Sequence, residues 1–316
     1  MKLVILDKVT MGYDTPFDIL DALGEVTEYE TTSPEELVSH IGDADVVILN
    51  KVKINEAAME KAPNMKLICV FATGFDNIDV AAAKKHGIAV CNVPGYSTDS
   101  VTLFTVATVL NLVSHLREYN DFVRSGEYSK SSFANKITPV FHEIKGKTWG
   151  IVGFGNIGRA VAKVAEAFGA RVIVNKRTPV SDYTCVDIDT LCKESDIITV
   201  HCPLNNETKN LINKEKIALM KKSVVLVNEA RGAVLKEEDV KDAVLNGDIA
   251  AFGCDVYSAE PFRDNHPYFD IMNCANVLLT PHTAWGAYEA RERCIYVILE
   301  NIKSFLSKQT LNRVDL

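Results

Sequence analysis

Nine short apolar runs, most of them separated by longer amphipathic segments, constrain the fold of this chain more than any other feature. The segments between the runs have helical spacing, as at residues 80–86, 157–168 and 237–246. Regular alternation of strand and helix predicts an α/β fold with mainly parallel sheets. The predicted strands are residues 3–6, 46–49, 67–70, 148–152, 172–174, 197–200, 224–227, 250–253 and 277–279.

Composition narrows the class of protein. The chain has 316 residues, 47% of them apolar and 24% charged, which is typical of a globular protein of about two domains. A net charge of −8 with no basic block argues against nucleic acid as a partner. No apolar run reaches 18 residues and no export signal is seen, so the sequence predicts a cytoplasmic protein without a membrane span.

Two seams divide the chain. Pro94-Gly95 predicts a turn at residues 92–99, and a helical segment follows over residues 100–124. The second seam is residues 280–282, and a last helix is predicted from residue 288 to about 305. We therefore expect one domain over residues 100–283 and another assembled from residues 1–99 plus 284–316. A cleft where the chain crosses twice would favour a ligand.

Residues 126–144 and the cysteines carry weaker signals. Residues 126–144 are polar and aperiodic, and we favour a subunit-contacting arm over a lid or an irregular excursion. The chain has eight cysteines and no C-x-x-C pair, so they are predicted to be buried hydrophobes, and no metal site is expected.

A glycine motif lies between a predicted strand and a predicted helix. Gly153 permits a tight turn, Gly155 lets backbone approach a pyrophosphate, and Gly158 lets helix and strand pack closely. The helix N-terminus then presents free N–H groups to the anion. This context predicts a dinucleotide site, with a ligand-free glycine turn as the alternative. The motif residues are Gly153, Phe154, Gly155, Asn156, Ile157 and Gly158.

The end of the next strand bears on the choice of nicotinamide cofactor. Enzymes that use NAD usually place an acidic residue there to bind the ribose 2′-hydroxyl. This chain instead has Asn175, Lys176, Arg177 and Thr178, a set able to receive a 2′-phosphate. We therefore favour NADP over NAD. A solvated basic turn in an enzyme that tolerates NAD is the alternative.

Three later strands end in turns with chemically useful side chains. Arg231 follows residues 224–227, Glu260 follows residues 250–253, and His282 follows residues 277–279. Since the carboxyl ends of parallel strands meet at one edge, the three residues are predicted to come together. Singly they are more typical of a surface arginine, a solvated glutamate and a core histidine.

The glycine motif and the turns that contain Arg231, Glu260 and His282, together with further segments, resemble those of the D-isomer-specific 2-hydroxyacid dehydrogenases. The resemblance spans nearly the whole chain, and the wording of residues 95–100 is most similar to the glycerate dehydrogenase or hydroxypyruvate (glyoxylate) reductase branch. It implies a Rossmann-type cofactor domain inserted in a flavodoxin-like substrate domain, and a homodimer. The segments that carry it are residues 73–79, 92–100, 153–158, 201–204, 230–232, 255–261, and Pro281-His282 with Trp285.

The resemblance implies hydride transfer between a nicotinamide and a small 2-keto acid, giving the D-2-hydroxy acid. Arg231 would bind the substrate carboxylate and polarise its carbonyl, together with backbone N–H groups of the loop at Thr73 and Gly74. His282 would donate a proton to the developing alkoxide. Glu260 would fix the histidine tautomer and favour the imidazolium.

The resemblance also assigns cofactor contacts. Asp255 would bind the nicotinamide carboxamide, and Cys202, Pro203, Glu229 and Ala230 would line the cofactor slot. His282 would contact the cofactor as well as the substrate. His201 is expected to be structural or to contact the cofactor. The other histidines, at positions 40, 86, 115, 142 and 266, have no partner motif and are expected to have ordinary structural roles.

Two departures and two alternatives remain open. Glu229 stands where the family mostly has a small or apolar residue, so its carboxylate would either repel a phosphate or face solvent. Thr102-Leu103-Phe104 stands in the first helix where the family commonly has a more polar sequence. A non-enzymatic sensor or corepressor-like protein on the same fold is the alternative function. A formate-type or phosphonate-type dehydrogenase is a second enzymatic alternative, and Glu260 argues against the formate class.

Overall fold

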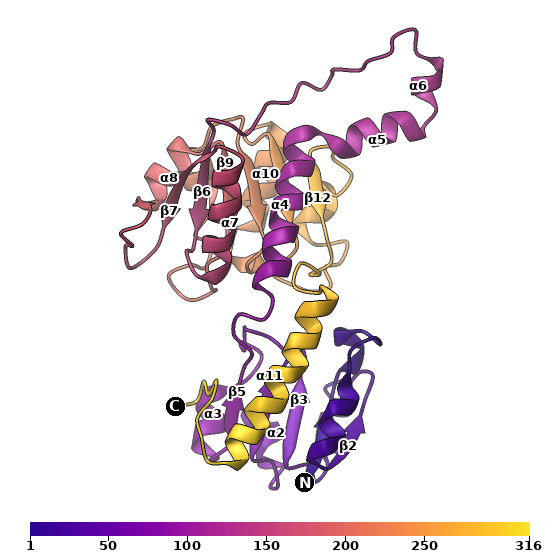
Figure 1. Cartoon of the computed structure of the whole chain (residues 1–316), viewed down its shortest axis with the longest axis vertical. Coiled ribbons are helices and arrows are strands. Elements are labelled where there is room, and N and C mark those ends of the chain that lie inside the picture. Colours follow the sequence, from indigo (N-terminus) through magenta and orange to yellow (C-terminus); the bar gives the residue numbers. More distant parts are fainter. The chain divides into compact units, whose positions relative to one another are not determined.

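The computed structural model describes residues 1–316 and divides into two compact units. One unit is Met1–Ser97 with Gly286–Leu316, and the other is Thr98–Trp285. Figure 1 follows the chain from the first unit into the second and back again, which the colours make visible. Each unit contains its own parallel sheet.

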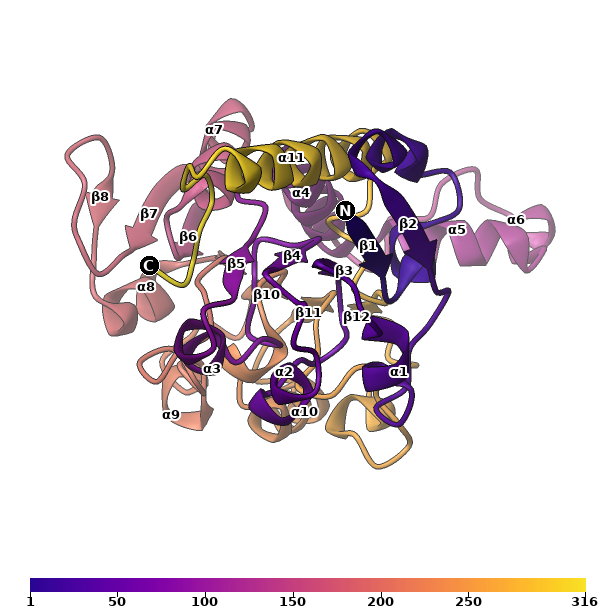
Figure 2. The ribbon, with the colours of Figure 1, turned by 90° about the horizontal axis from the view of Figure 1, so that it is seen from below.

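The first unit is built on a five-stranded parallel sheet of order β2-β1-β3-β4-β5. This order is that of flavodoxin-like doubly wound folds. Helix α11 (Tyr288–Leu306) covers one face, and α1 (Leu37–Ile41), α2 (Glu56–Glu60) and α3 (Val80–Lys85) cover the other (Figure 2). The strands are β1 (Lys2–Ile5), β2 (Glu25–Glu28), β3 (Val46–Leu49), β4 (Leu67–Val70) and β5 (Ala89–Cys91).

The second unit contains a seven-stranded sheet of order β12-β11-β10-β9-β6-β7-β8, and every pairing in it is parallel. Six of the strands reproduce the Rossmann order, and β12 extends the sheet. The strands are β6 (Thr148–Val152), β7 (Arg171–Asn175), β8 (Thr184–Cys185), β9 (Ile197–Val200), β10 (Val225–Asn228), β11 (Ala251–Cys254) and β12 (Val277–Leu279).

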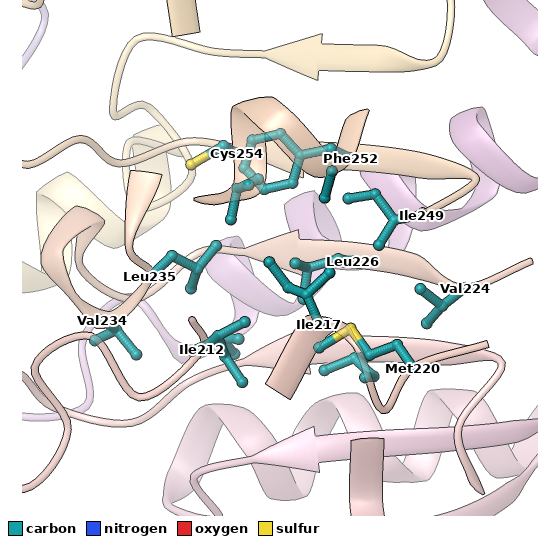
Figure 3. Close-up of a cluster of buried hydrophobic side chains, with 14 of the residues drawn as sticks. Ile212, Ile217, Met220, Val224, Leu226, Val234, Leu235, Ile249, Phe252 and Cys254 are labelled. Carbon is teal, nitrogen blue, oxygen red and sulfur yellow. The ribbon is translucent and has the colours of Figure 1, made fainter. Parts of the chain in front are cut away.

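Helices cover both faces of the larger sheet. One hydrophobic cluster joins it to α4 (Thr98–Ser114) and α7 (Asn156–Ala167). The opposite cluster joins it to α8 (Ile188–Glu194), α9 (Lys214–Ile217) and α10 (Glu237–Asn246). Figure 3 shows this second cluster, in which Leu226 and Phe252 of neighbouring strands lie among aliphatic side chains from the loops and helices.

The predicted two-sheet α/β architecture is confirmed, and all nine predicted strands are present within one or two residues at each end. Three strands were missed. β2 is an edge strand with the sequence Glu-Val-Thr-Glu, so it has no apolar run. β5 and β8 have only three and two residues, which is too short for a periodic signal.

The prediction of a single helix over residues 100–124 is wrong. His115 adopts a left-handed backbone conformation with φ of 54°, and it separates α4 from α5 (Leu116–Arg124). The two helices meet at an angle of 65°. No single helix is long and apolar enough to cross a membrane, although this bent pair meets the criteria of length and composition together.

An arm extends from the second unit beyond the bend (Figure 1). It comprises α5, α6 (Glu127–Lys130) and the irregular chain that returns towards β6, and neither helix has a buried residue. Exposed apolar side chains are spread along it, namely Leu116, Val123, Tyr128, Phe133, Ile137, Val140 and Phe141.

The cysteines fit the predicted packing role. All eight are free, and six are buried. Burial raises the pKa of the Cys192 thiol to about 12, so this residue behaves as a small hydrophobe.

Candidate active site

The glycine turn after β6 is shaped by close backbone approaches. Gly153 has φ of +90°, and a Cβ there would lie 2.4 Å from the backbone nitrogen of Cys202. A Cβ on Gly158 would lie 2.3 Å from the carbonyl oxygen of Gly153. Both positions therefore require glycine, as the sequence predicted.

Gly155 differs from its neighbours because no atom lies within 4 Å of the place its Cβ would take. It is the N-cap of α7, and no side chain caps the first N–H groups there. Gly155 and Asn156 are exposed, whereas the ring of Phe154 is buried against Tyr183 and Arg159. Open space beside uncapped N–H groups fits a dinucleotide pyrophosphate, which would contact backbone at residues 154–157.

The turn after β7 presents basic side chains to solvent. Asn175 donates its side-chain N–H to the carbonyl of Val186, so it serves the sheet edge. Lys176 is half-buried and Thr178 is exposed. The side chain of Arg177 is 85% exposed and lies 3.9 Å from the side chain of Glu207, which is 72% exposed. An exposed pair of this kind contributes little to stability and leaves the guanidinium accessible.

Three adjacent strands carry the predicted chemical residues. β10, β11 and β12 lie side by side, and Arg231, Glu260 and His282 follow them at the same edge of the sheet. Glu260 Oε2 lies 2.6 Å from His282 Nδ1. Because a carboxylate only accepts, the proton of this contact lies on Nδ1, which fixes the orientation of the ring and of its other nitrogen, Nε2. Arg231 is half-buried, and its guanidinium donates to the carbonyl of Ala230.

His282 has a left-handed backbone, with φ of 52°, which costs on the order of 1 kcal/mol for a residue other than glycine. The loop around it holds this conformation. Trp285 Nε1 donates to the His282 carbonyl at 3.0 Å, and Asp255 accepts from the N–H groups of Thr283 and Ala284 at 2.9 and 2.8 Å. The side chain is therefore presented by a strained but firmly bonded turn.

Asp255 anchors this turn, a role that the sequence analysis missed. Besides the two N–H groups it accepts the hydroxyl of Thr280 at 2.6 Å, and only 1% of the residue is exposed. A signal was available, because Asp255 directly follows β11 and Thr280 directly follows the neighbouring β12. The predicted contact with a nicotinamide carboxamide remains an expectation.

A row of polar residues continues along this edge of the sheet. Strand register aligns Val200, Asn228 and Cys254, the last residues of β9, β10 and β11. The residues that directly follow these strand ends are His201, Glu229 and Asp255. Both ring nitrogens of His201 are buried without a hydrogen-bond partner, and burial lowers the pKa of this imidazole to about 3. The imidazole of His201 is thus neutral, and its nitrogens are shielded although the residue as a whole is half-buried.

Glu229 is buried, so the expectation that its carboxylate faces solvent is wrong. Only 7% of the residue is exposed, Oε1 is 3.4 Å from the Thr108 hydroxyl, and Oε2 has no partner. Burial, and secondarily the charge of Asp255, raises the pKa of Glu229 to about 9. The side chain is therefore a neutral acid at pH 7.

The remaining predicted residues lie as follows. Cys202 is buried in the core cluster beneath the glycine turn, Pro203 is exposed, and Ala230 is half-buried. Thr73 and Gly74 belong to the first unit, in the loop after β4. The Thr73 hydroxyl donates to the carbonyl of Val93, which ties that loop to the chain after β5.

The buried acid predicts an unusual dependence of stability on pH. A carboxyl whose folded pKa is raised to about 9 retains its proton when folded but loses it when unfolded. The free energy of unfolding then falls by roughly 1.4 kcal/mol per pH unit as the pH rises from 4.5, the ordinary pKa of a glutamate, towards 9. Glu229→Gln cannot ionise, so we expect it to gain about 3 kcal/mol relative to the wild type between pH 6 and pH 8. Urea unfolding at pH 6, 7 and 8 measures this.

The matched control for this experiment is Glu238→Gln, because the Glu238 side chain is 55% exposed. Its stability should follow that of the wild type at every pH. An identical pH dependence in Glu229→Gln and the wild type would contradict the prediction.

Comparison with known proteins agrees with this geometry. Residues 106–284 match the model of the D-isomer-specific 2-hydroxyacid dehydrogenase, NAD-binding domain. The chain is 38% identical to a hydroxypyruvate reductase of Blautia hydrogenotrophica over the full length of both chains. It is 34% identical to a glycerate dehydrogenase of Methylorubrum extorquens, covering 99% of each chain.

Solved structures give the same result. An acyclic imino acid reductase in complex with NADPH and D-Arg superposes with a TM-score of 0.89 at 30% identity, covering 99% of this chain and 100% of the other. A D-lactate dehydrogenase of Aquifex aeolicus, in complex with NAD and lactic acid, gives a TM-score of 0.86 at 28% identity, covering 100% of this chain and 99% of the other. The chain therefore belongs to the D-isomer-specific 2-hydroxyacid dehydrogenase family, and it is a nicotinamide-dependent oxidoreductase of the glycerate dehydrogenase and hydroxypyruvate reductase branch.

Proposed function

We propose that this enzyme reduces a small 2-keto acid, hydroxypyruvate or glyoxylate, to the corresponding 2-hydroxy acid. The observation that carries the proposal is the 2.6 Å contact between Glu260 Oε2 and His282 Nδ1 at the carboxyl edge of a Rossmann sheet. A carboxylate-bound imidazole is a proton donor suited to an alkoxide. The names of the relatives reported above support this substrate class.

The chemistry divides between cofactor and protein. A bound reduced nicotinamide supplies the hydride that is added to the keto carbon. His282 donates the Nε2 proton to the oxygen of that carbon, and takes it back in the reverse direction. Glu260 accepts from Nδ1 throughout, so it fixes the orientation of the ring and stabilises its charged form.

Arg231 is assigned to the substrate carboxylate. Its guanidinium is always charged and presents several donors in one plane, which suits two-point binding of a carboxylate. We assign the backbone N–H groups of the Thr73 and Gly74 loop to the same carboxylate. In this proposal the second unit binds cofactor and the first contributes to substrate binding.

Removing the proton donor tests the central assignment. His282→Gln should lower kcat for hydroxypyruvate reduction by about 10²- to 10⁴-fold, because the alkoxide would lose its acid. The dissociation constant of the reduced cofactor, measured by fluorescence titration, should stay within about twofold, because the glycine turn lies elsewhere on the sheet. His86→Gln, which alters a surface histidine paired with Glu56, is the control and should keep full activity. A His282→Gln enzyme that retains most of the wild-type kcat would overturn the proposal.

We also propose that the enzyme prefers NADPH. The turn after β7 has no acidic residue to bind a ribose 2′-hydroxyl, and it offers Lys176, Arg177 and Thr178 to a 2′-phosphate. Glu229 follows β10, which β9 and β6 separate from β7, so its carboxyl does not lie at this turn.

Substituting the most exposed of these bases tests the preference. Arg177→Ala should raise KM for NADPH about tenfold or more while leaving KM for NADH within about twofold, because only the phosphate loses a partner. Arg171→Ala at the start of the same strand, where the arginine pairs with Glu194, is the matched control. A wild-type kcat/KM that is higher with NADH than with NADPH would contradict the proposal.

The arm suggests the quaternary structure. Exposed apolar side chains on α5, α6 and the irregular chain that follows them are costly in water, and a second copy of the chain would bury them. We therefore propose a homodimer in which the arms contact the partner subunit.

Sedimentation tests the homodimer. The wild type should sediment with twice the 34.8 kDa chain mass at micromolar concentration. Phe133→Asp combined with Ile137→Asp should sediment at the chain mass, since charge on the arm opposes its burial. Tyr13→Asp places the same charge on an apolar side chain that is 75% exposed outside the arm, and it should remain dimeric. A monomeric wild type would refute the assignment.

A further inference from the structure

We infer that Glu237 is a positioning residue for this reaction, because it fixes the loop that presents Glu260 to His282. The inference rests on the proposed roles of Glu260 and His282. The effect of Glu237 would pass through the backbone of that loop, which Glu237 holds at Ser258.

Glu237 opens α10 and is 8% exposed in its side chain. Its two carboxylate oxygens accept from one residue of the loop. Oε1 accepts the backbone N–H of Ser258 at 2.8 Å, and Oε2 accepts the Ser258 hydroxyl in a short hydrogen bond. A carboxylate in the first turn of a helix is also favoured by the helix dipole, which stabilises Glu237 at this place.

The next link is a close approach of two backbones. A Cβ on Gly232 would lie 2.0 Å from the carbonyl carbon of Tyr257 and 2.2 Å from the nitrogen of Ser258. The loop therefore packs directly on the residue that follows Arg231. Glu237, which follows the short 3-10 turn Gly232–Val234 in the chain, holds Ser258 in this position.

Tyr257 links this loop both to Glu260 and to the chain just before His282. Its backbone N–H donates to Glu260 Oε1 at 3.0 Å, so the carboxylate that touches His282 through Oε2 is held through its other oxygen. Its hydroxyl donates to the carbonyl of Thr280 at 2.7 Å, at the end of the strand before His282. Fixing Tyr257 and Ser258 therefore fixes both partners of the Glu260–His282 contact.

His266 is a further neighbour of the Glu237 carboxylate. Its Nδ1 accepts the backbone N–H of Tyr268 at 3.1 Å, so the ring proton is on Nε2, which lies 3.0 Å from Glu237 Oε2. That contact is close but lacks hydrogen-bond alignment. The ring packs among Tyr257, Phe262 and Tyr268. An ordinary structural role was expected for His266, and in the structure this residue lies against the carboxylate of Glu237.

The chain supplies a matched pair of variants for the test. Glu237→Gln keeps the side-chain shape and one acceptor, and Glu237→Ala removes both acceptors. Glu238→Gln, on the next residue of the same helix, is the control because Glu238 is exposed and pairs only with Lys241. His282→Gln is measured in the same series.

The readouts are kcat and KM for hydroxypyruvate, the pH profile of kcat, reduced-cofactor affinity by fluorescence and the thermal midpoint. Glu237→Ala should lower kcat about 10- to 100-fold, with less change in KM and cofactor affinity, because a loosened carboxylate misplaces the imidazole. The alkaline limb of the reduction profile should move to lower pH by about half a unit or more, because a less closely held carboxylate stabilises the imidazolium less. Glu237→Gln should show the same changes to a smaller extent, and Glu238→Gln should match the wild type.

The outcomes separate this inference from the proposed function. If His282→Gln loses activity while Glu237→Ala, folded by its thermal midpoint, keeps the wild-type pH profile and kcat, the positioning role is refuted. If Glu237→Ala does not fold, the inference depends on Glu237→Gln, and an unshifted profile in that variant also refutes it. If His282→Gln itself keeps its activity, the proposed function fails instead.

Discussion

The structure of the active-site edge depends on the hydrogen bonds that the Asp255 carboxylate accepts. This carboxylate is almost wholly buried, and it accepts hydrogen bonds from the Thr280 hydroxyl and from the N–H groups of Thr283 and Ala284. These bonds hold a turn in which His282 adopts a left-handed backbone that it would not favour alone. A charged acceptor with three donors is strong enough to impose such strain, because bonds to an ionised group are worth about twice those between neutral ones. The position of the histidine is thus determined by a residue on the neighbouring strand.

Glu229 lies next in the row, and burial, with the nearby charge of Asp255 as a secondary cause, raises the pKa of this carboxyl to about 9. Two carboxylates at adjacent strand ends cannot both be charged in a buried setting without a cation between them. Asp255 has three donors that stabilise its charge, whereas Glu229 has a single long contact with Thr108 and an unpartnered oxygen. The long contact with Thr108 is too weak to offset the effect of burial on the pKa of Glu229. The raised pKa also explains how an acidic residue can stand beside a cofactor edge without adding negative charge there.

Most of the fold could be predicted from the sequence, because parallel strands buried on both faces are written as apolar runs. The runs at residues 148–152 and 197–200 coincide with β6 and β9. The edge strand β2 escaped because it is mostly charged, and the helix break escaped because only the backbone of His115 shows it. At the site, the glycine turn followed from the motif and its context, and strand order predicted that Glu260 and His282 come together. The bond between them was implied by the resemblance to the family. The state of Glu229, the anchoring by Asp255 and the loop contacts of Glu237 depend on register and burial, which a single sequence does not display.

The discontinuous first unit has a consequence for how the protein is made. Helix α11 covers one face of the five-stranded sheet and buries Cys294, Ile295, Ile298 and Ile302, yet it is encoded after the whole of the second unit (Figure 2). At a synthesis rate of about 5–20 residues per second, the ribosome needs roughly ten seconds or more to traverse residues 98–285. During that interval the earlier strands lack their cover, so the nascent chain must either delay pairing them or shelter an apolar face. The inserted unit, which is continuous in sequence, is free to fold first and to bring the two separated halves of its host together.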